Sequence, residues 1–195
     1  MQSPQQAHWD AAMRVLWFLK SSPGQGIIFP KENDLTLIAY CDSDWASSPL
    51  TWKSTTEFLM KLGSTPVSWK TKKQTTVSKS SSEAEYRAMN QATSEIICLR
   101  SLLSCLQVQC NSPTVLHCDN QAAIHIAANP VYHERTKHIE VDCHFIRRHL
   151  QARTISTSYI PTKKQQAGIF TKALGASSFH ELMVNLGAHD PRPPT

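Results

Sequence analysis

Acidic side chains stand where predicted strands end or a predicted helix begins. Asp42 and Asp44 follow an alternating, strand-like run, and Asp119 follows a second one. Glu85 lies in the first turn of the longest predicted helix. Neighbouring strand ends in a mixed sheet form a crevice, and carboxylates that share a crevice repel each other unless a cation lies between them. Their hard oxygen ligands suit Mg²⁺ or Mn²⁺, so we predict a metal site made of Asp42, Glu85 and Asp119.

Each of these acids also has a purely structural explanation. Ser82 and Glu85 have the spacing of a capping box. Asp119 precedes a predicted helix at a place where an N-cap residue is expected, and Asp42 and Asp44 could be solvated turn residues. For Glu85 and Asp119 taken singly the structural explanation is favoured. The structural explanation must hold for all of these acids at once, however. Taken together, their positions favour the metal site.

The elements that would position these acids follow from hydrophobic periodicity. Strands are predicted at residues 35–42, 56–62, 66–71, 114–119 and 154–160, with a turn at Gly63 and Ser64. Helices are predicted from Ser3-Pro4 to Pro23-Gly24, at 82–107, 121–128, 138–152 and 164–173, and from Ser178 to Gly187. Successive strands followed by alternating helices and strands predict an α/β fold, with a mixed five-stranded sheet and helices on both faces.

Composition limits the classes of function. The chain has 195 residues, of which 41% are apolar, enough for a core. It has no apolar run long enough to span a membrane. The N-terminus lacks the pattern of a secretory signal, so we expect an intracellular, reducing compartment. The 6 cysteines form no C-x-x-C pair and are expected mostly as small core residues. A net charge of +5 is compatible with a polyanionic partner.

Long motifs follow one another along the chain: CDSDWA, KSTTEF, VSWKTKKQTTVSKSSSEAEYRA, LHCDNQAAIHIAANPVYHERTKHIEVDCHFIR and YIPTKKQQAGIFTKAL. They resemble the ribonuclease H domain of copia-type (Pseudoviridae) retrotransposon Pol polyproteins, those of plants above all. The resemblance implies that residues 1–30 are the C-terminal end of the reverse-transcriptase or connection region. It implies that 31–175 form the ribonuclease H domain, and that 176–195 form a C-terminal helix and a loose tail.

The resemblance also implies an activity, which is metal-dependent endonucleolytic cleavage of the RNA strand of RNA–DNA hybrids during reverse transcription. Asp42, Glu85 and Asp119 would hold two Mg²⁺ or Mn²⁺ ions that clamp the scissile phosphate and activate water. The implied partners are the RNA–DNA hybrid and the reverse-transcriptase domain of the parent polyprotein. If the chain is expressed from an element, the resemblance implies a cytoplasmic virus-like particle as its location. We expect the ribonuclease H strand order 3-2-1-4-5. The oligomeric state stays open.

One position departs from the family in a way that bears on catalysis. The family motif A-D-I-F-T-K reads AGIFTK here, so Gly168 stands where the fourth carboxylate belongs. Glu57 stands where the family has glycine, and Trp52 where it has arginine. The second ion should therefore be bound weakly. The alternative function is a catalytically decayed remnant that folds and binds nucleic acid but cleaves poorly.

A basic run lies just upstream of Glu85 and contains no acid. We predict that it contacts the nucleic-acid backbone, although such a run can also be an ordinary solvated face; its residues are Trp69, Lys70, Lys72, Lys73 and Lys79.

Two other kinds of site are less favoured. A zinc site could use Cys143 with His133, His138, His144 or His149, but the C-x-x-C pair common in structural zinc sites is missing. The same segment carries the Arg135-Lys137-His138 cluster, which could touch nucleic acid or be solvated charge.

A DDE-type integrase core needs the order Asp, Asp, Glu, whereas this chain has Asp, Glu, Asp.

Overall fold

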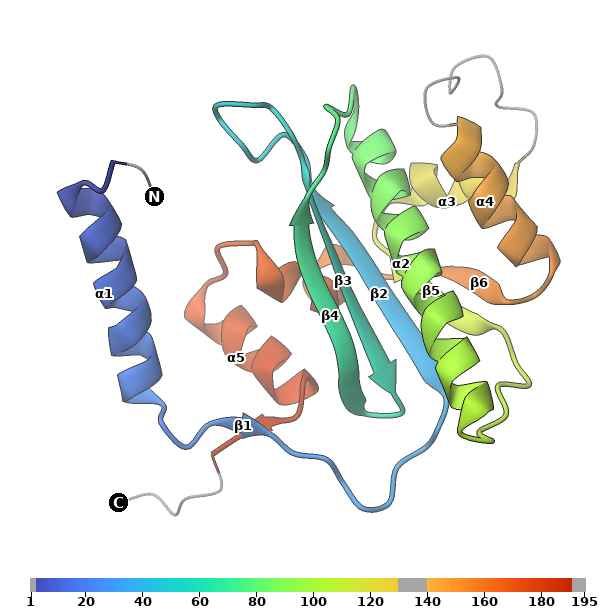
Figure 1. The fold of residues 1–195 in the computed structure, drawn as a ribbon, viewed down its shortest axis with the longest axis horizontal. Coiled ribbons are helices and arrows are strands. Elements are labelled where there is room, and N and C mark those ends of the chain that lie inside the picture. Colours follow the sequence, from blue (N-terminus) through green and yellow to red (C-terminus); the bar gives the residue numbers. More distant parts are fainter. Residues whose placement is uncertain (1–2, 130–139, 191–195) are drawn as a thin grey trace.

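A five-stranded mixed sheet forms the centre of the molecule (Figure 1). The structure is a computed structural model that describes residues 3–129 and 140–190. The sheet has the order β4-β3-β2-β5-β6; its strands are β2 (Leu37–Asp44), β3 (Thr55–Leu62), β4 (Thr65–Lys73), β5 (Thr114–Cys118) and β6 (Ile155–Tyr159). The first three strands pair antiparallel, and β5 and β6 run parallel to β2. This confirms the predicted strand order.

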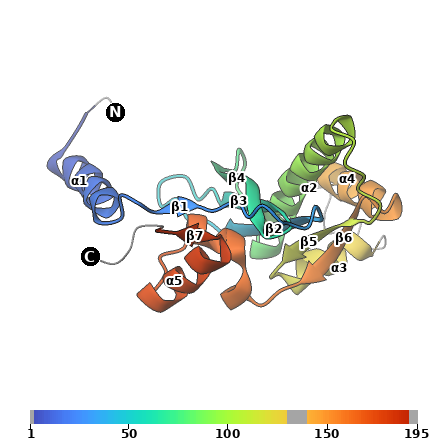
Figure 2. The ribbon, with the colours of Figure 1, turned by 90° about the horizontal axis from the view of Figure 1, so that it is seen from below.

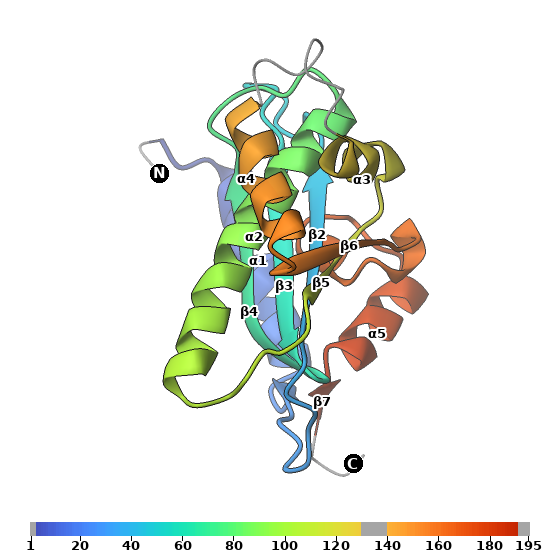
Figure 3. The same cartoon turned by 90° about the vertical axis from the view of Figure 1, so that its right-hand side faces the viewer.

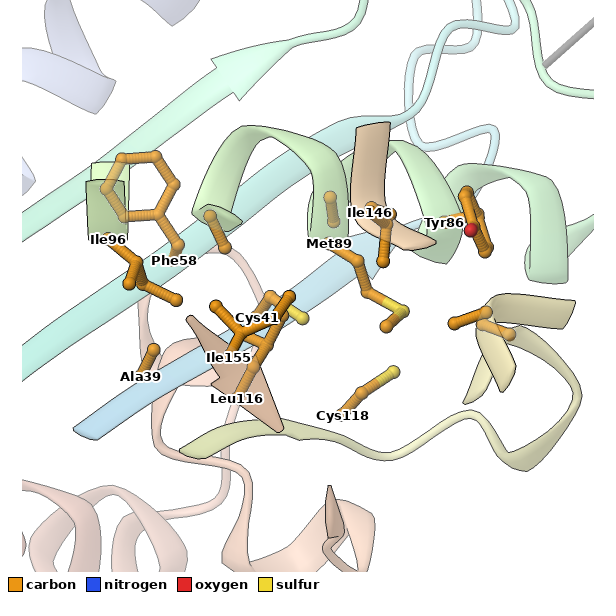
Figure 4. Packing of buried hydrophobic residues seen from close by; sticks show 14 of the residues in the cluster. Ala39, Cys41, Phe58, Tyr86, Met89, Ile96, Leu116, Cys118, Ile146 and Ile155 are labelled. Carbon is orange, nitrogen blue, oxygen red and sulfur yellow. The ribbon is translucent and has the colours of Figure 1, made fainter. Parts of the chain in front are cut away.

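Three helices cover one face of this sheet (Figure 3). They are α2 (Ser81–Cys105), α3 (Gln121–Ala128) and α4 (Glu140–Gln151). The predicted stripe of α2 is buried from Ala84 to Ile96, but Leu106 at its end is exposed. Figure 4 shows Ala39, Cys41 and Phe58 of the sheet facing α2 and α4 across the main core.

The opposite face carries short helices, as Figure 2 shows for α5. These are η3 (Thr162–Lys164), η4 (Gln166–Phe170) and α5 (Ala176–Asn185). The predicted α-helix at 164–173 is wrong, because two 3-10 turns stand there. Gln165, buried between them, donates from Nε2 to the Cys41 carbonyl at 2.8 Å and accepts from the Ala167 N–H at 3.3 Å. This anchor to the sheet interrupts a continuous helix.

The N-terminal helix stands apart from the sheet (Figure 1). In α1 (Gln6–Ser21) no residue is buried, so the predicted stripe around Leu16 faces outward. The Phe18 ring contacts the Phe179 ring of α5 edge to face, with centroids 6.2 Å apart. Two short strands that the sequence did not predict, β1 (Gly26–Ile27) and β7 (Ala188–His189), pair antiparallel and join the two ends of the described chain.

Other sequence-based expectations have mixed outcomes. Gly63 does form the predicted turn, with φ +57. The capping box predicted at Ser178 is wrong, since α5 begins at Ala176 without a side-chain cap. No cysteine among the described residues forms a disulfide, but half of them are not in the core: Cys98 and Cys105 are exposed and Cys110 is half-buried. Within the described residues, no helix is long and apolar enough to cross a membrane.

Candidate active site

Two neighbouring parallel strands bring Asp42 and Asp119 together. Strands β2 and β5 are in register from Ile38 opposite Val115 to Tyr40 opposite His117. Asp42 lies two residues further along β2, and Asp119 directly follows β5. Residues two apart in a strand share a face, so Asp42 lies on the side of Tyr40, whose ring stacks on His117 with centroids 4.9 Å apart. Asp42 is buried and 1% exposed.

Glu85 reaches the same strand ends from the other face of the sheet. The Ser43 N–H donates both to Asp42 Oδ1 at 2.8 Å and to Glu85 Oε1 at 3.2 Å. One backbone amide therefore joins two carboxylates that are far apart in the sequence. The capping box predicted from Ser82 is wrong, because the N-cap is Ser80, whose hydroxyl accepts from the Glu83 N–H at 3.2 Å.

Asp119 is not an N-cap either. The α3 helix is capped by Asn120, whose Oδ1 accepts from the Ala123 N–H at 3.0 Å. Asp119 Oδ2 instead accepts from the Thr162 hydroxyl at 2.8 Å. Since η3 follows β6, this bond connects the end of β5 to the segment beyond the next strand. The capping explanations for Glu85 and Asp119 are therefore contradicted by where the caps lie.

A lysine that sequence reasoning did not assign lies between the aspartates. Lys172 follows η4, and its Nζ is 2.5 Å from Asp42 Oδ2 and 4.0 Å from Asp119 Oδ2. Burial lowers the pKa of Lys172, but the ion pair with Asp42 and the charges of Asp119 and Glu85 outweigh burial and raise it. A cation thus already occupies the space next to these two carboxylates.

The acid cluster raises the pKa values of Glu85 and Asp119. Burial, followed by the charges of Cys118, Asp42 and Asp119, raises the pKa of Glu85 far above its ordinary value. Burial and then Asp42 raise the pKa of Asp119. Such shifts mean that negative charge at these positions is insufficiently compensated. The site therefore favours a proton or a cation.

Three groups that can bind a metal ion lie close together. Ligand atoms of Glu85, Cys118 and Asp119 all lie within 4.8 Å of one another. Cys118, which was not predicted as a site residue, is buried. Asp42 Oδ2 is also buried and, apart from its ion pair with Lys172, has no polar partner among the described residues. This set of mainly hard oxygen donors fits Mg²⁺ or Mn²⁺.

Residue 168 lies directly beside these groups. Gly168 is buried in η4, and a Cβ atom there would lie 3.0 Å from Asp42 Oδ2 and 3.2 Å from Lys172 Cδ. A side chain at this position would point at Asp42. Of the candidate zinc ligands, His133 and His138 lie outside the described residues, as does the Arg135-Lys137-His138 cluster.

The predicted basic run follows the edge strand β4. The side chains of Trp69, Lys70, Lys72 and Lys73 are exposed there, and Lys79 is exposed before α2. Because side chains alternate along a strand, Lys70 and Lys72 point to one face, and Trp69 and Lys73 to the other. A pocket of about 200 Å³ between β4 and α2 is lined by Lys72, Lys73, Arg87 and Asn90, among others.

Comparisons with known proteins identify relatives along almost the whole chain. It is 41% identical over 187 residues, or 96% of its length, to a retrovirus-related Pol polyprotein from transposon RE2 of Arabidopsis thaliana. It is 32% identical over 189 residues to that from transposon TNT 1-94 of Nicotiana tabacum. The chain spans only 13% and 14% of these two polyproteins. No protein-family model matches the chain.

A solved structure with the same fold is LC11-RNase H1, isolated from compost. The two superpose with a TM-score of 0.51 at 13% identity, over 67% of this chain and 88% of that one. At this identity the likeness concerns the fold alone. The predicted α/β fold of the ribonuclease H type is thereby confirmed.

Proposed function

This chain belongs to the family of plant retrotransposon Pol polyproteins, and on that premise we propose that it is their ribonuclease H segment. Its reaction in this proposal is endonucleolytic hydrolysis of the RNA strand of an RNA–DNA hybrid during reverse transcription. Residues 31–175 form the catalytic domain in this proposal. Residues 1–30 end the reverse-transcriptase or connection region, and 176–195 form the C-terminal extension.

The observation that carries this proposal is the convergence of three carboxylates. Asp42, Glu85 and Asp119 come from β2, α2 and the end of β5, and meet through the Ser43 amide and the Lys172 ammonium. Core packing does not require three buried or half-buried acids at one point. Their crowding is unfavourable for folding alone, since buried carboxylates are stable only when they are compensated.

Asp42, Glu85 and Asp119 are the residues that would hold divalent ions. Ions bound there would supply Lewis-acid activation of water and stabilise the leaving 3′-oxygen. The protein's own part is to hold the carboxylates in place. Ser43 fixes one oxygen each of Asp42 and Glu85, and Thr162 fixes Asp119. Because Gly168 offers no ligand, a second ion would be held more weakly than the first.

The hybrid would be bound through its backbone. A hybrid duplex resembles A-form RNA, which is recognised by shape, phosphates and 2′-hydroxyls. The exposed lysines of β4 and Lys79 would supply phosphate contacts, and Trp69 an exposed aromatic surface beside them. Binding should therefore show little sequence preference.

Cleavage of a labelled hybrid tests the proposal. The native chain with Mn²⁺ or Mg²⁺ should release short RNA fragments, and Asp42→Asn should abolish this release. Single-stranded RNA and duplex DNA of the same sequence serve as substrate controls. Cleavage that is equal in the native chain and in Asp42→Asn, or absent under all conditions, would refute the enzymatic proposal.

A decayed, binding-only domain is the second candidate, and Gly168 favours it. The decayed form would bind the hybrid with the salt dependence of a phosphate-contacting protein but would not cleave it. Hybrid binding without cleavage in either metal supports this candidate.

A further inference from the structure

A fourth buried carboxylate lies opposite Asp42 in the sheet. Glu57 of β3 is the register partner of Asp42 in the antiparallel β2–β3 pair. Directly opposed residues point to the same face, with Cβ atoms about 4.5–5.5 Å apart. Glu57 therefore lies on the face of the sheet that η4 covers, as Asp42 does.

The Glu57 side chain is inside the protein and has no hydrogen-bond partner among the described residues. The residue is 0% exposed, and neither carboxylate oxygen accepts a hydrogen bond from any described residue. The Thr171 hydroxyl is near enough to lower the pKa of Glu57. It does not form a hydrogen bond with Glu57 or with any other described residue. The charges that act on Glu57 are those of Asp42, Lys172 and Asp44.

Folding alone gives no reason for an acid at this position. An unpaired buried carboxylate is strongly unfavourable, and like charges directly opposite each other in a sheet destabilise it. Lys172 is the nearby cation, but its ammonium is in contact with Asp42. One ammonium faces Asp42, Asp119 and Glu57 together, so negative charge remains in excess on this face.

Gly168 and Glu57 flank the same carboxylate. A Cβ atom at residue 168 would lie 3.0 Å from Asp42 Oδ2, and Glu57 approaches Asp42 from the neighbouring strand. The chain thus lacks a carboxylate on the η4 side of Asp42 and carries an additional one on its β3 side. The two positions differ in element but share Asp42 as their neighbour.

We propose that Glu57 supplies the carboxylate that residue 168 does not, so that Asp42 and Glu57 together bind the second divalent cation. This inference rests on the proposed function, since it concerns the same metal site. The ligand class is a hard, oxygen-preferring divalent ion such as Mn²⁺ or Mg²⁺. On binding, the ion would neutralise the negative charge that Lys172 does not balance.

Titration of the full chain with Mn²⁺ tests this directly, with free Mn²⁺ followed by electron paramagnetic resonance and binding heat by calorimetry. The native chain should bind one ion more tightly and a second more weakly. Glu57→Gln keeps the side-chain volume and should weaken the second ion at least about tenfold. Glu95→Gln is the matched control, because Glu95 lies on α2 and accepts from Ser68 at 2.7 Å, outside the acid cluster; it should bind as the native chain does.

A relocated carboxylate provides a second test. Glu57→Gly alone should lose the second ion, and adding Gly168→Asp to it should restore binding. Thermal unfolding in Mn²⁺ and in chelator gives an independent readout: the metal-induced rise in midpoint should be smaller in both Glu57 variants than in the native chain. Native-like isotherms and midpoint shifts in both variants would overturn the proposal.

These titrations need no catalysis, so the two proposals fail separately. If Glu57→Gln binds two ions normally while cleavage still depends on Asp42, Glu57 is not a ligand and the ribonuclease proposal stands. If the second ion depends on Glu57 but no hybrid is cleaved, Glu57 is a ligand in a domain without activity.

Discussion

At the scale of single residues, Lys172 acts as the counter-charge of the acid cluster. Lys172→Met should destabilise the protein in chelator, because it leaves Asp42 buried without a cation. Breaking a buried ion pair from one side costs roughly 3–5 kcal/mol, and the 30% exposure of the Lys172 side chain puts the expected loss at the low end. Saturating Mn²⁺ should recover most of the lost stability. Mn²⁺ should also bind more tightly to Lys172→Met than to the native chain.

Denaturant unfolding in chelator and in Mn²⁺ measures both effects. Lys164→Met is the control, since Lys164 is exposed in η3. An unchanged free energy of unfolding for Lys172→Met in chelator would mean that the ion pair contributes nothing to stability.

We expect the free energy of unfolding to depend on pH through the protonation of Glu57. Burial above all, with a further contribution from Asp42, raises the pKa of Glu57 from 4.5 to about 7. A carboxyl group with a raised folded-state pKa contributes stability that is complete below pH 4.5 and is lost as the pH rises through about 7. Glu57→Gln should therefore match the native chain near about pH 4.5, and exceed its free energy of unfolding by up to about 3 kcal/mol near pH 8.

Chemical denaturation at several pH values in chelator gives this comparison. The native chain and Glu95→Gln should follow parallel curves, whereas the gap between native and Glu57→Gln should widen with pH. A gap that stays constant would show that Glu57 does not change its protonation state between these pH values.

Gly168→Asp tests the residue that the family resemblance marks as degenerate. The new side chain requires Asp42 and Lys172 to move by a few tenths of an ångström, but it adds a ligand beside Asp42. Cleavage of the hybrid should rise about a hundredfold. Gly175→Asp is the matched control, because a Cβ atom there meets nothing within 4 Å. Equal rates for the native chain and Gly168→Asp would show that the existing carboxylates suffice.

At the scale of elements, the sequence predicted what long periodic patterns encode. The sheet order and the buried stripe of α2 follow from alternation and from the spacing of small apolar residues such as Ala84 and Ala88. The two-residue strands β1 and β7 have no pattern to detect. The break between η3 and η4 depends on Gln165 bonding to Cys41, a contact 124 positions away along the chain.

The acid positions were predictable because strand ends and helix starts are local features, and the motifs around Asp42, Glu85 and Asp119 carry the resemblance. Lys172 and Glu57 were not, for a physical reason. Their importance arises from a register pair between neighbouring strands and from an ion pair between residues far apart in the sequence, which no local pattern encodes. The capping error at α2 has a related cause, since Ser80 with Glu83 and Ser82 with Glu85 have the same spacing and the sequence alone does not distinguish them.

The edge strand β4 carries its own prediction. Changing Lys70, Lys72 and Lys73 together to Gln should weaken hybrid binding, and should lower the slope of log affinity against log salt by about 0.7–0.9 per lost phosphate contact. Because these residues alternate between two faces, Lys70→Gln/Lys72→Gln and Lys73→Gln should differ in effect. Fluorescence anisotropy over a salt series measures the slopes, with Lys20→Gln/Lys31→Gln as control. Unchanged slopes would identify the run as ordinary solvated surface.

At the scale of the whole molecule, the candidate site lies where the two layers of the fold meet. Asp42 and Glu57 lie on the face covered by η4, whereas Glu85 arrives with α2 from the opposite face. Asp119 adds the segment beyond β6 through Thr162. The site therefore forms only when both layers are assembled on the sheet, which couples metal binding to global stability.

The N-terminal helix is the part of the molecule that this coupling should not include. Within α1 no residue is buried, and its large apolar side chains are mostly exposed, with Trp9 at 64% and Trp17 at 62%. Apart from the contact of Phe18 with Phe179, this helix of 16 residues has little tertiary packing to stabilise it, and most helical stability in proteins comes from such packing. In hydrogen exchange followed by mass spectrometry, α1 amides should exchange nearly without protection while α2 amides exchange slowly, and Mn²⁺ should protect α2 further but leave α1 unchanged. Repeating the measurement after tenfold dilution controls for self-association through the apolar face. Protection of α1 comparable to that of α2 in the dilute protein would contradict this prediction and place α1 within the cooperative unit.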